Sequence, residues 1–316
     1  MYLADRAAPA TTGPDTTRRP AWRVSSVVLA LGAVSLITDV SSEMVTAVLP
    51  LYLVVGLGLS PLGFGTLDGV YNGVSALVQL TGGHLADRVR NHKLIAGLGY
   101  GLSALCKPLL LLVHSLGPLG VVLALERTGK GLRTSPRDAL ISLSTPAEHR
   151  GRAFGVHRAM DTTGAVLGPV TAFLILRAAT DGYDAVFGVS ACVAVLGVLV
   201  LVLFVPGKRQ LAAAGIGSAP DAPGRGPVNL REAVALLRLP RLRGLAGCAV
   251  LLGLTTVSDA FVYLLLQHRA HIGEEWFPLM PLGTASVFLL LAVPAGVLAD
   301  RVGRRVVFLA GHAALL

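Results

Sequence analysis

Charged residues are scarce in this sequence. They account for 14% of its 316 residues, whereas hydrophobic residues account for 53%. A soluble domain carries about 25% charged residues, because its water-facing surface requires them. The deficit excludes an ordinary soluble domain and indicates a protein that places most of its surface in lipid.

Cysteine and histidine are too few and too scattered for a disulfide framework or a metal centre. The three cysteines lie far apart in apolar stretches, at Cys106, Cys192 and Cys248, where a thiol behaves as a small hydrophobic group. The eight histidines show no spacing typical of metal ligands. We therefore expect no metal and no cofactor.

The sequence has no convincing nucleotide-binding loop. The glycine-rich stretch GLGYG at 97–101 lies within an apolar run and lacks the strand and the acidic partner that such a loop requires. Close packing of a membrane helix is the better interpretation of these glycines. The sequence thus gives no support for an enzyme.

Long apolar runs take up most of the chain. A membrane-crossing helix needs about 20 apolar residues. Runs of that kind fall at 25–56, 62–84, 94–115, 117–137, 152–177, 184–205, 244–267 and 277–299, and a ninth begins near 306. These runs predict an all-α membrane protein. The ninth run has only 11 residues, which as a helix span about half of a hydrocarbon core of about 30 Å. We therefore expect a C-terminally truncated chain of about eight and a half helices.

Positive charge gathers on one side of the expected membrane. When the runs are threaded alternately through a bilayer, the Lys and Arg residues lie in or beside the N-terminus and the even-numbered connections, except Lys107, Arg177 and Arg269. Cytoplasmic loops carry such an excess. The asymmetry predicts a multi-pass plasma-membrane protein with a cytoplasmic N-terminus. It also accounts for the net charge of +9 without a nucleic-acid partner.

The threading divides the chain into four segments. Residues 1–23, rich in Thr, Pro and Arg, are expected to be a disordered cytoplasmic tail. Residues 24–205 are expected to form a six-helix bundle, and 244–316 a partial second bundle with helices 7, 8 and the start of 9. Residues 206–243, rich in Gly, Ala and Pro, form a cytoplasmic central loop. Its second part is either an amphipathic helix on the inner leaflet or an extension of the next span.

Two short patterns occur once in each half. GHLADRVRNHKLIAG (83–97) follows the second run, and GVLADRVGRRVVFLAG (296–311) follows the eighth. Likewise, SLITD (35–39) in the first run matches TTVSD (255–259) in the seventh. Matching positions in two sets of helices indicate a duplication, as found in transporters with parallel repeats.

On these loops the sequence resembles the major facilitator superfamily, over residues 25–316. The first copy departs from the family pattern at Arg90, Asn91 and His92. The resemblance implies two six-helix halves, a conformational latch at these loops, a small-molecule substrate and a monomer. The residues that match the loop signature are Gly83, Asp87, Arg88, Gly296, Asp300, Arg301, Gly303, Arg304 and Arg305.

Several ionisable residues lie inside the apolar runs. A charge near the bilayer centre costs at least about 2.5 kcal/mol, so it lines a cavity or pairs with another charge. Five acids and four bases, with Lys107 and Glu126 included, lie at such depths, and this near balance favours pairing for most of them. The candidates for proton coupling or for the cavity are Asp39, Glu43, Arg127, Lys130, Arg158, Asp161 and Asp259.

The fourth run carries a motif around its arginine. Leu123-x-x-x-Arg127-x-x-Lys130-Gly131 resembles a helix 4 motif of the superfamily, with Lys130 where Gln is usual. In proton-coupled members this arginine is implicated in proton transfer. The alternative is an arginine that pairs with a neighbouring acid. Glu126 and Lys130 are also spaced for an i,i+4 pair.

The fifth run, GVHRAMDTTGAVLGP at 155–169, places its charges at one end and its glycines at the other. Gly155, Gly164, Gly168 and Pro169 follow the spacing Gly-x8-Gly-x3-Gly-Pro. Gly164 and Gly168 share a face, so a neighbouring helix can approach closely, and Pro169 permits a bend. This spacing resembles the antiporter motif of the drug:proton branch; a generic close-packing helix is the alternative.

These features predict a secondary transporter that moves small amphipathic molecules outward by alternating access, with protons as the coupling ion. The stretches TDVSSEM, ERTGKGLRTSPRDALI and HRAMDTTGAVLGP together resemble a bacterial subgroup of efflux-like members. Two alternatives remain open. One is a metabolite uniporter or symporter on the same scaffold, and the other is a truncated fragment without transport activity.

Overall fold

The computed structural model of the chain describes residues 24–89, 91–113, 115–146, 149–207, 239–255 and 257–315. Within these ranges the chain forms helices and no β-strand, which confirms the all-α fold. The expected N-terminal tail at 1–23 lies outside the described residues. So does most of the central loop, whose last residues, from Pro240, begin α9 (Pro240–Thr255).

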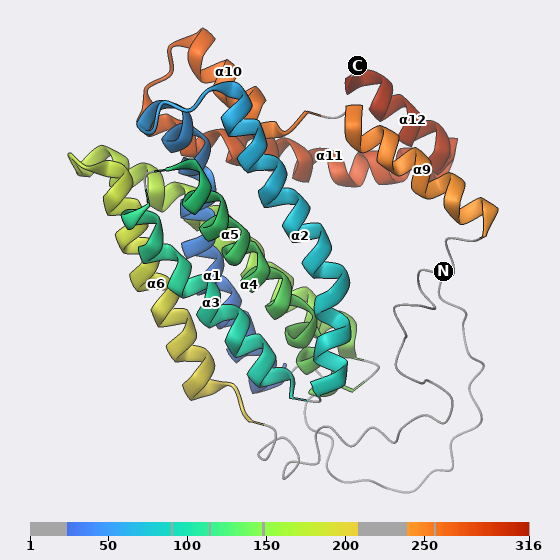
Figure 1. Ribbon diagram of the computed structural model, residues 1–316. Helices are drawn as coiled ribbons and strands as arrows, with labels where there is room; N and C mark the ends of the chain where they lie inside the picture. The colour runs from blue at the N-terminus through green and yellow to red at the C-terminus, as the bar shows by residue number, and fades with distance from the viewer. Residues whose placement is uncertain are drawn as a thin grey trace, which may run out of the picture.

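Six long helices lie side by side in the N-terminal bundle (Figure 1). We call the end of the bundle where α1 begins the lower end and the end where α1 stops the upper end. A short π-helical turn, η1 (Tyr52–Gly56), continues α1 at the upper end. The helices are α1 (Ser26–Leu51), α2 (Pro61–Val89), α3 (His92–Leu112), α4 (Leu116–Leu143), α5 (Arg150–Ala178) and α6 (Gly182–Phe204).

The fourth helix is longer than the sequence predicted. It was expected to end near residue 137, where Pro136 would strain it, but α4 continues to Leu143 with Pro136 inside. The side chains of Arg133 and Arg137, near the lower end of this helix, lie within the bundle. The fifth helix, expected over 152–177, runs from Arg150 to Ala178.

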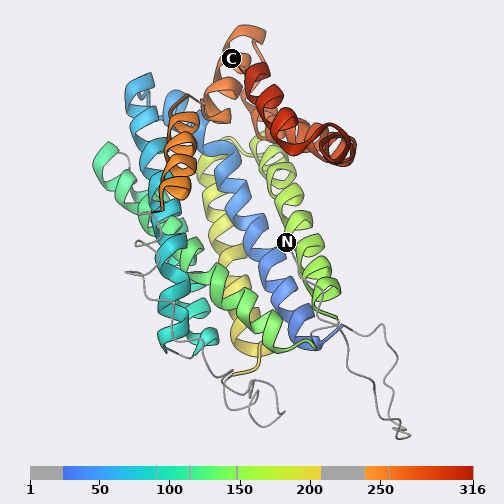
Figure 2. The same cartoon turned by 90° about the vertical axis from the view of Figure 1, so that its right-hand side faces the viewer.

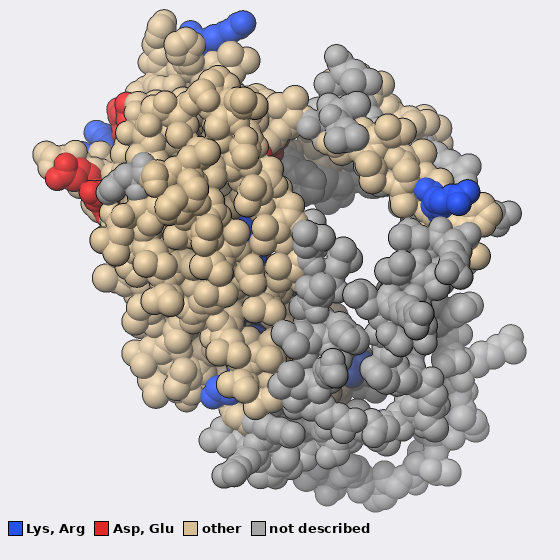
Figure 3. Space-filling view, in the orientation of Figure 1, with Lys and Arg blue, Asp and Glu red and all other residues tan. Residues whose placement is uncertain are grey.

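Four helices in the described part of the chain are long and apolar enough to cross a membrane by length and composition. They cover Ser26–Gly56, His92–Leu112, Arg150–Ala178 and Gly182–Phe204. Helix α4 is not among them because it carries many charges, which it places among the other helices. The wall of the bundle shows few Lys, Arg, Asp or Glu side chains, and these gather towards its ends (Figure 3).

Helix α1 passes through two apolar clusters with a polar segment between them. The lower cluster includes Val28, Leu31 and Tyr100, and the upper cluster includes Met44 and Phe187. Between them, residues 35–43 of α1 are mostly polar and several of their side chains are buried, among them the ionisable Asp39, which would be costly to place in lipid. We call this stretch and its partners the polar layer.

Glycines let α5 approach α1 backbone to backbone at the polar layer. A Cβ atom on Gly164 would lie 2.5 Å from the carbonyl oxygen of Leu36, and one on Gly168 would lie 2.7 Å from Cβ of Glu43. Gly155, the first glycine of the predicted motif, has open space around it. The motif therefore contains two packing glycines, while Gly155 has no packing role here.

The opposite face of α1 packs on α6, and the two helices lie together with α5 in Figure 2. Ser41 Oγ donates to the carbonyl of Ser190 at 2.8 Å, and Ser190 Oγ donates to the carbonyl of Ser41 at 2.9 Å. A Cβ atom on Gly197 would lie 2.5 Å from the methyl group of Thr38. Helix α1 is thus held on both sides at the depth of the polar layer.

The C-terminal part contacts the bundle through α10, η4 and α11. The expected seventh span is interrupted, because Val257 and Ser258 are not helical. Helix α10 and the 3₁₀ turn η4 lie against the bundle and α11 contacts α5, whereas α9 and α12 are set apart from the bundle in Figure 1. The bounds are α9 (Pro240–Thr255), α10 (Asp259–Ala270), η4 (Glu274–Leu279), α11 (Met280–Val302) and α12 (Arg304–Leu315).

The close contact at Gly164 gives a test of this packing. Gly164→Leu should lower the thermal unfolding midpoint in detergent by at least about 2 °C, because the neighbouring backbone of Leu36 cannot yield. Gly155→Leu is the matched control and should leave the midpoint unchanged or raise it, since leucine favours the helix and has room. Equal losses in both variants would contradict the α1–α5 seam.

Candidate functional site

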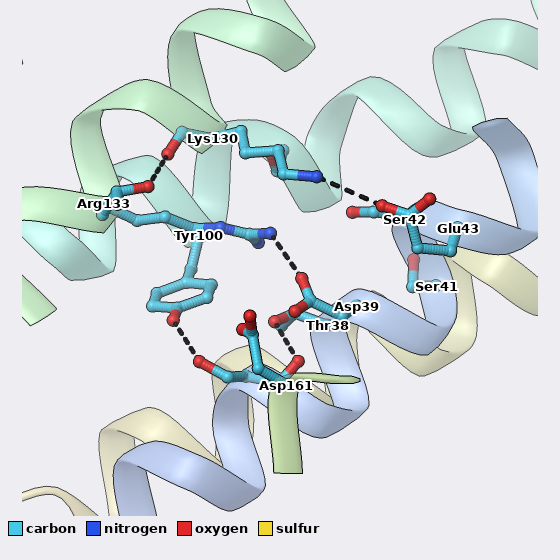
Figure 4. Close-up of polar contacts among 12 residues, drawn as sticks. Thr38, Asp39, Ser41, Ser42, Glu43, Tyr100, Lys130, Arg133 and Asp161 are labelled. Carbon is cyan, nitrogen blue, oxygen red and sulfur yellow. Dashed lines mark hydrogen bonds and ion pairs between the residues drawn. The ribbon is translucent and has the colours of Figure 1, made fainter. Parts of the chain in front are cut away.

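Helix α4 presents a row of cations to the interior of the bundle. Arg127, Lys130, Arg133 and Arg137 follow one another at intervals of three or four residues, which places them along one side of the helix. Each meets an acidic side chain, and the partners come from α1, α4 and α5. Figure 4 shows the central part of this arrangement.

The most deeply buried of the α4–α1 pairs joins Asp39 to Arg133. Asp39 Oδ1 accepts from Arg133 Nη2 at 3.2 Å, and the two residues are 8% and 3% exposed. The guanidinium group also lies over the ring of Tyr100, 4.7 Å from its centroid. Removing either partner would leave a buried charge without compensation, which is far more costly than losing a surface pair.

One turn further up α1, Glu43 meets Lys130. Lys130 Nζ donates to Glu43 Oε1 at 3.2 Å, and the side chains are 32% and 26% exposed for Lys130 and Glu43. The predicted i,i+4 pair between Glu126 and Lys130 is therefore wrong: the lysine turns to α1. Of the two ion pairs between α1 and α4, this one is the more exposed to solvent.

Asp161 of α5 brings a second carboxyl group to Asp39. The carboxyl groups of Asp39 and Asp161 lie close together in Figure 4. Arg137 Nη1 lies 3.5 Å from Asp161 Oδ1, and Arg158 Nη1 lies 3.4 Å from Asp161 Oδ2. A hydrogen bond between two carboxyl groups requires that one of them carries a proton. Two carboxyl groups that lie close together repel each other when both are ionised.

Polar groups extend the layer from these carboxyl groups towards the lower end. Ser35 Oγ accepts from Arg137 Nη1 at 3.3 Å and lies 3.0 Å from His157 Nε2 and 3.5 Å from Tyr100 Oη. His157 is buried. Arg158 is different, because its side chain is 78% exposed and reaches Asp161 only from outside.

Arg127 is buried, as the sequence predicted for a residue near mid-depth, but it does not reach Asp39. Its guanidinium group lies 3.4 Å from the centroid of Tyr71, and its Nε atom lies 3.4 Å from Glu126 Oε2. Glu126 also accepts from Lys107 Nζ at 3.3 Å. The contacts of Arg127 thus agree with the alternative in which this arginine pairs with a neighbouring acid.

Asp259 is the candidate that lies apart from the polar layer. It was expected inside a continuous helix, but it is the first residue of α10, next to the non-helical Ser258. There it lines a cavity of about 270 Å³ at the upper end of the bundle, together with Thr46 of α1 and Asp68 and Tyr71 of α2. The cavity therefore lies between the first six helices and the C-terminal part.

The two copies of the loop motif lie at helix junctions. The first copy closes α2, and the second spans the end of α11 and the start of α12, where Gly303 has a φ of +101° that favours glycine. The latch role of the motif stays a prediction. The motif residues whose side chains lie outside the described part are Gly83, Asp87, Arg88, Gly296, Asp300, Arg301, Arg304 and Arg305.

A family model described as the Major Facilitator Superfamily matches residues 30–316. The chain belongs to this superfamily. Membership indicates a membrane-embedded transporter and not an enzyme. The likeness covers both the six-helix bundle and the C-terminal part.

Two groups of relatives support the assignment to the major facilitator superfamily. An uncharacterised MFS-type transporter of Methanocaldococcus jannaschii is 31% identical over 297 residues, which are 92% of this chain and 70% of that protein. Proteins of Mycobacterium bovis and Mycobacterium tuberculosis are each 33% identical over 171 residues, or 54% of this chain and 42% of the relative. The chain thus contains more of the length of the first relative than of the mycobacterial ones.

Solved structures show the same fold. A bacterial homologue of the human lysosomal transporter Spinster, inward-facing and unoccupied, has a TM-score of 0.63 at 18% identity, covering 88% of this chain and 63% of its own. A peptide transporter in complex with sulfate has a TM-score of 0.54 at 19% identity, covering 80% and 52%. At these identities the likeness concerns the fold alone.

Sequence reasoning missed the partners that complete the site. Arg133 and Arg137 were only counted among the charges in or beside the cytoplasmic segments, and Asp68 and Tyr71 were overlooked. The regular spacing of Arg127, Lys130 and Arg133 could have indicated a continuing helix face. Asp68, which lies in the second apolar run, could have been found by the argument applied to Asp39.

The Asp39–Arg133 pair gives a stability prediction. Arg133→Gln should lower the thermal unfolding midpoint in detergent by at least about 6 °C, because Asp39 is left buried without its cation. Adding Asp39→Asn should restore part of the loss. Arg158→Gln is the control and should shift the midpoint by less than about 4 °C, since its side chain is 78% exposed. A double variant no more stable than Arg133→Gln would refute the coupling.

Proposed function

We propose that this protein is a proton-coupled exporter of small amphipathic molecules that works by alternating access in the plasma membrane, with its N-terminus in the cytoplasm. The observation that carries the proposal is the pair of carboxyl groups of Asp39 and Asp161, held between α1 and α5 beside Arg133 and Arg137. Such a pair can hold one proton and release it when its surroundings change.

The proton changes the balance of charge in the polar layer. With one proton between the carboxyl groups, Asp39 and Asp161 are joined by a hydrogen bond. Without it, two carboxylates face each other and each depends on its arginine. Because α1 and α5 touch at Gly164 and Gly168, a change in repulsion acts directly on a tight helix seam. This is a physical link between protonation and helix movement.

The other charged candidates take supporting roles in this proposal. Glu43 and Lys130 form the half-exposed pair through which water reaches the layer. Arg158 balances Asp161 from the lower end, and Arg127 holds the position of Tyr71 at the cavity. Asp259, which is far from the carboxyl pair along the bundle, belongs to the substrate cavity.

Export is proposed on the glycine motif of α5. Its spacing resembles that of drug:proton antiporters, and its Gly164 and Gly168 pack on the helix that carries Asp39. A symporter of a metabolite could use the same carboxyl pair with the opposite direction of substrate movement. The direction in which the substrate moves relative to the proton therefore distinguishes an exporter from a symporter.

Asp39→Asn tests the proposal in proteoliposomes that contain the 316-residue chain and are given a pH gradient. Movement of ethidium against the proton gradient should fall at least about tenfold, because an amide cannot exchange a proton. Exchange of labelled for unlabelled ethidium without a gradient should continue. Asp161→Asn should behave in the same way.

The control is Asp184→Asn, an exposed acid at the start of α6 that is outside the polar layer. It should leave gradient-driven movement unchanged. Undiminished coupling in Asp39→Asn would remove the carboxyl pair from the mechanism. Accumulation of substrate along with protons would replace the exporter by a symporter, and absence of exchange in the unaltered chain would favour an inactive fragment.

A further inference from the structure

The cavity at the upper end of the bundle has a charge pattern opposite to that of the whole chain. Its lining contains Asp68 of α2 and Asp259 of α10 and no Lys, Arg or His among the described residues. The chain as a whole has 27 Lys and Arg against 18 Asp and Glu. Two carboxylates facing one cavity in so basic a protein indicate selection for positive charge in the bound molecule.

The acids of the cavity differ from those of the polar layer. Asp39, Glu43 and Asp161 each have a cation within 3.5 Å. In the described part of the chain, neither Asp68 nor Asp259 has such an ion pair. A negative pair in a largely apolar cavity is stabilised when a cation enters.

Helix geometry accounts for one of the two acids but not for the other. Asp259 is the first residue of α10, where a carboxylate is favoured by the helix dipole whatever the cavity binds. Asp68 lies two turns inside α2, so it has no such role. The presence of Asp68 is therefore the stronger indication that the cavity binds a cation.

Aromatic rings complete the lining of the cavity. Tyr71, Tyr263 and Phe277 contribute to its walls, and ring faces attract cations. The guanidinium group of Arg127 lies over one face of Tyr71, 3.4 Å from the ring centroid, and Arg127 shares Glu126 with Lys107, so Tyr263 and Phe277 are the rings left for a ligand. Tyr263 Oη donates to Thr284 Oγ1 at 2.8 Å, which fixes the orientation of its ring.

We propose that this cavity binds organic cations, namely a quaternary ammonium or protonated amine attached to a small apolar or aromatic body. The cationic head lies near Asp68 and Asp259, and the body packs against the aromatic and aliphatic walls. The inference names the substrate class of the proposed exporter and rests on that function for transport, but the binding itself does not depend on proton coupling.

Binding of a matched set of benzyl compounds tests the charge preference. The purified chain in lipid nanodiscs is titrated by calorimetry with benzyltrimethylammonium, benzyl alcohol and phenylmethanesulfonate. The cation should bind at least about tenfold more tightly than the anion, because of the two carboxylates. Equal binding of the cation and the anion would overturn the proposal.

Variants locate the effect in the cavity. Asp68→Asn should weaken binding of benzyltrimethylammonium by about tenfold and leave benzyl alcohol unchanged. Asp68→Glu, which keeps the charge, should retain most of the affinity, and Asp184→Asn is the matched control outside the cavity. Unchanged cation affinity in Asp68→Asn, with the thermal unfolding midpoint preserved, would also overturn the proposal.

The outcome is separable from that of the proposed function. Asp39→Asn should bind benzyltrimethylammonium as the unaltered chain does, even though its proton coupling is lost. If the unaltered chain binds the cation but shows no proton coupling, the proposal of a proton-coupled exporter is wrong and the proposal of a cation-binding cavity is retained. If transport is coupled to protons but the cavity binds cation and anion equally, the exporter proposal is retained and the cation-binding proposal is wrong.

Discussion

The pairing of buried charges between α4 and α1 is the interaction on which this bundle depends. Helix α4 carries too many cations to lie against lipid, and α1 carries acids at the depth where a charge is most costly. Each helix is tolerated because the other is present: Arg133 meets Asp39 and Lys130 meets Glu43, both at 3.2 Å. The surrounding apolar helices can then present hydrocarbon to the membrane.

These pairs form only because the helices come unusually close. Gly164 and Gly168 bring α5 onto α1, and a Cβ atom on Gly129 of α4 would lie 2.7 Å from the carbonyl oxygen of Gly99 on α3. The residue after Gly99 is Tyr100, whose ring supports Arg133. Small residues at the seams and large charged groups between them are therefore parts of one arrangement.

The sequence was sufficient for the helical fold and for the burial of Asp39 and Arg127, because the cost of charge in lipid acts at the level of single residues. It was not sufficient for the choice of partners. That choice depends on how far each helix continues and how it is rotated about its axis. Both Arg127 and Arg133 lie on α4, but only the structure shows that Arg133 is the one that meets Asp39.

The lining of the cavity was also not predictable from the sequence, because it depends on which helices come together. Asp259 was recognised as an unusual acid, yet its place at the start of α10 depends on a break in the seventh span. Asp68 was within reach of sequence reasoning but had no repeat or motif to draw attention to it. Only the approach of α2 to α10 around one cavity gives these acids a common environment.

Hydration changes steeply along α1, from the half-exposed Glu43–Lys130 pair to the nearly dry Asp39–Arg133 pair one turn below. The two pairs therefore differ in how fast they can respond to the solvent. In the proposed transport cycle, the wet pair equilibrates with bulk water first, and the dry pair follows only after the helices have shifted. The difference in exposure between these two neighbouring ion pairs therefore sets the order in which they respond during the proposed cycle.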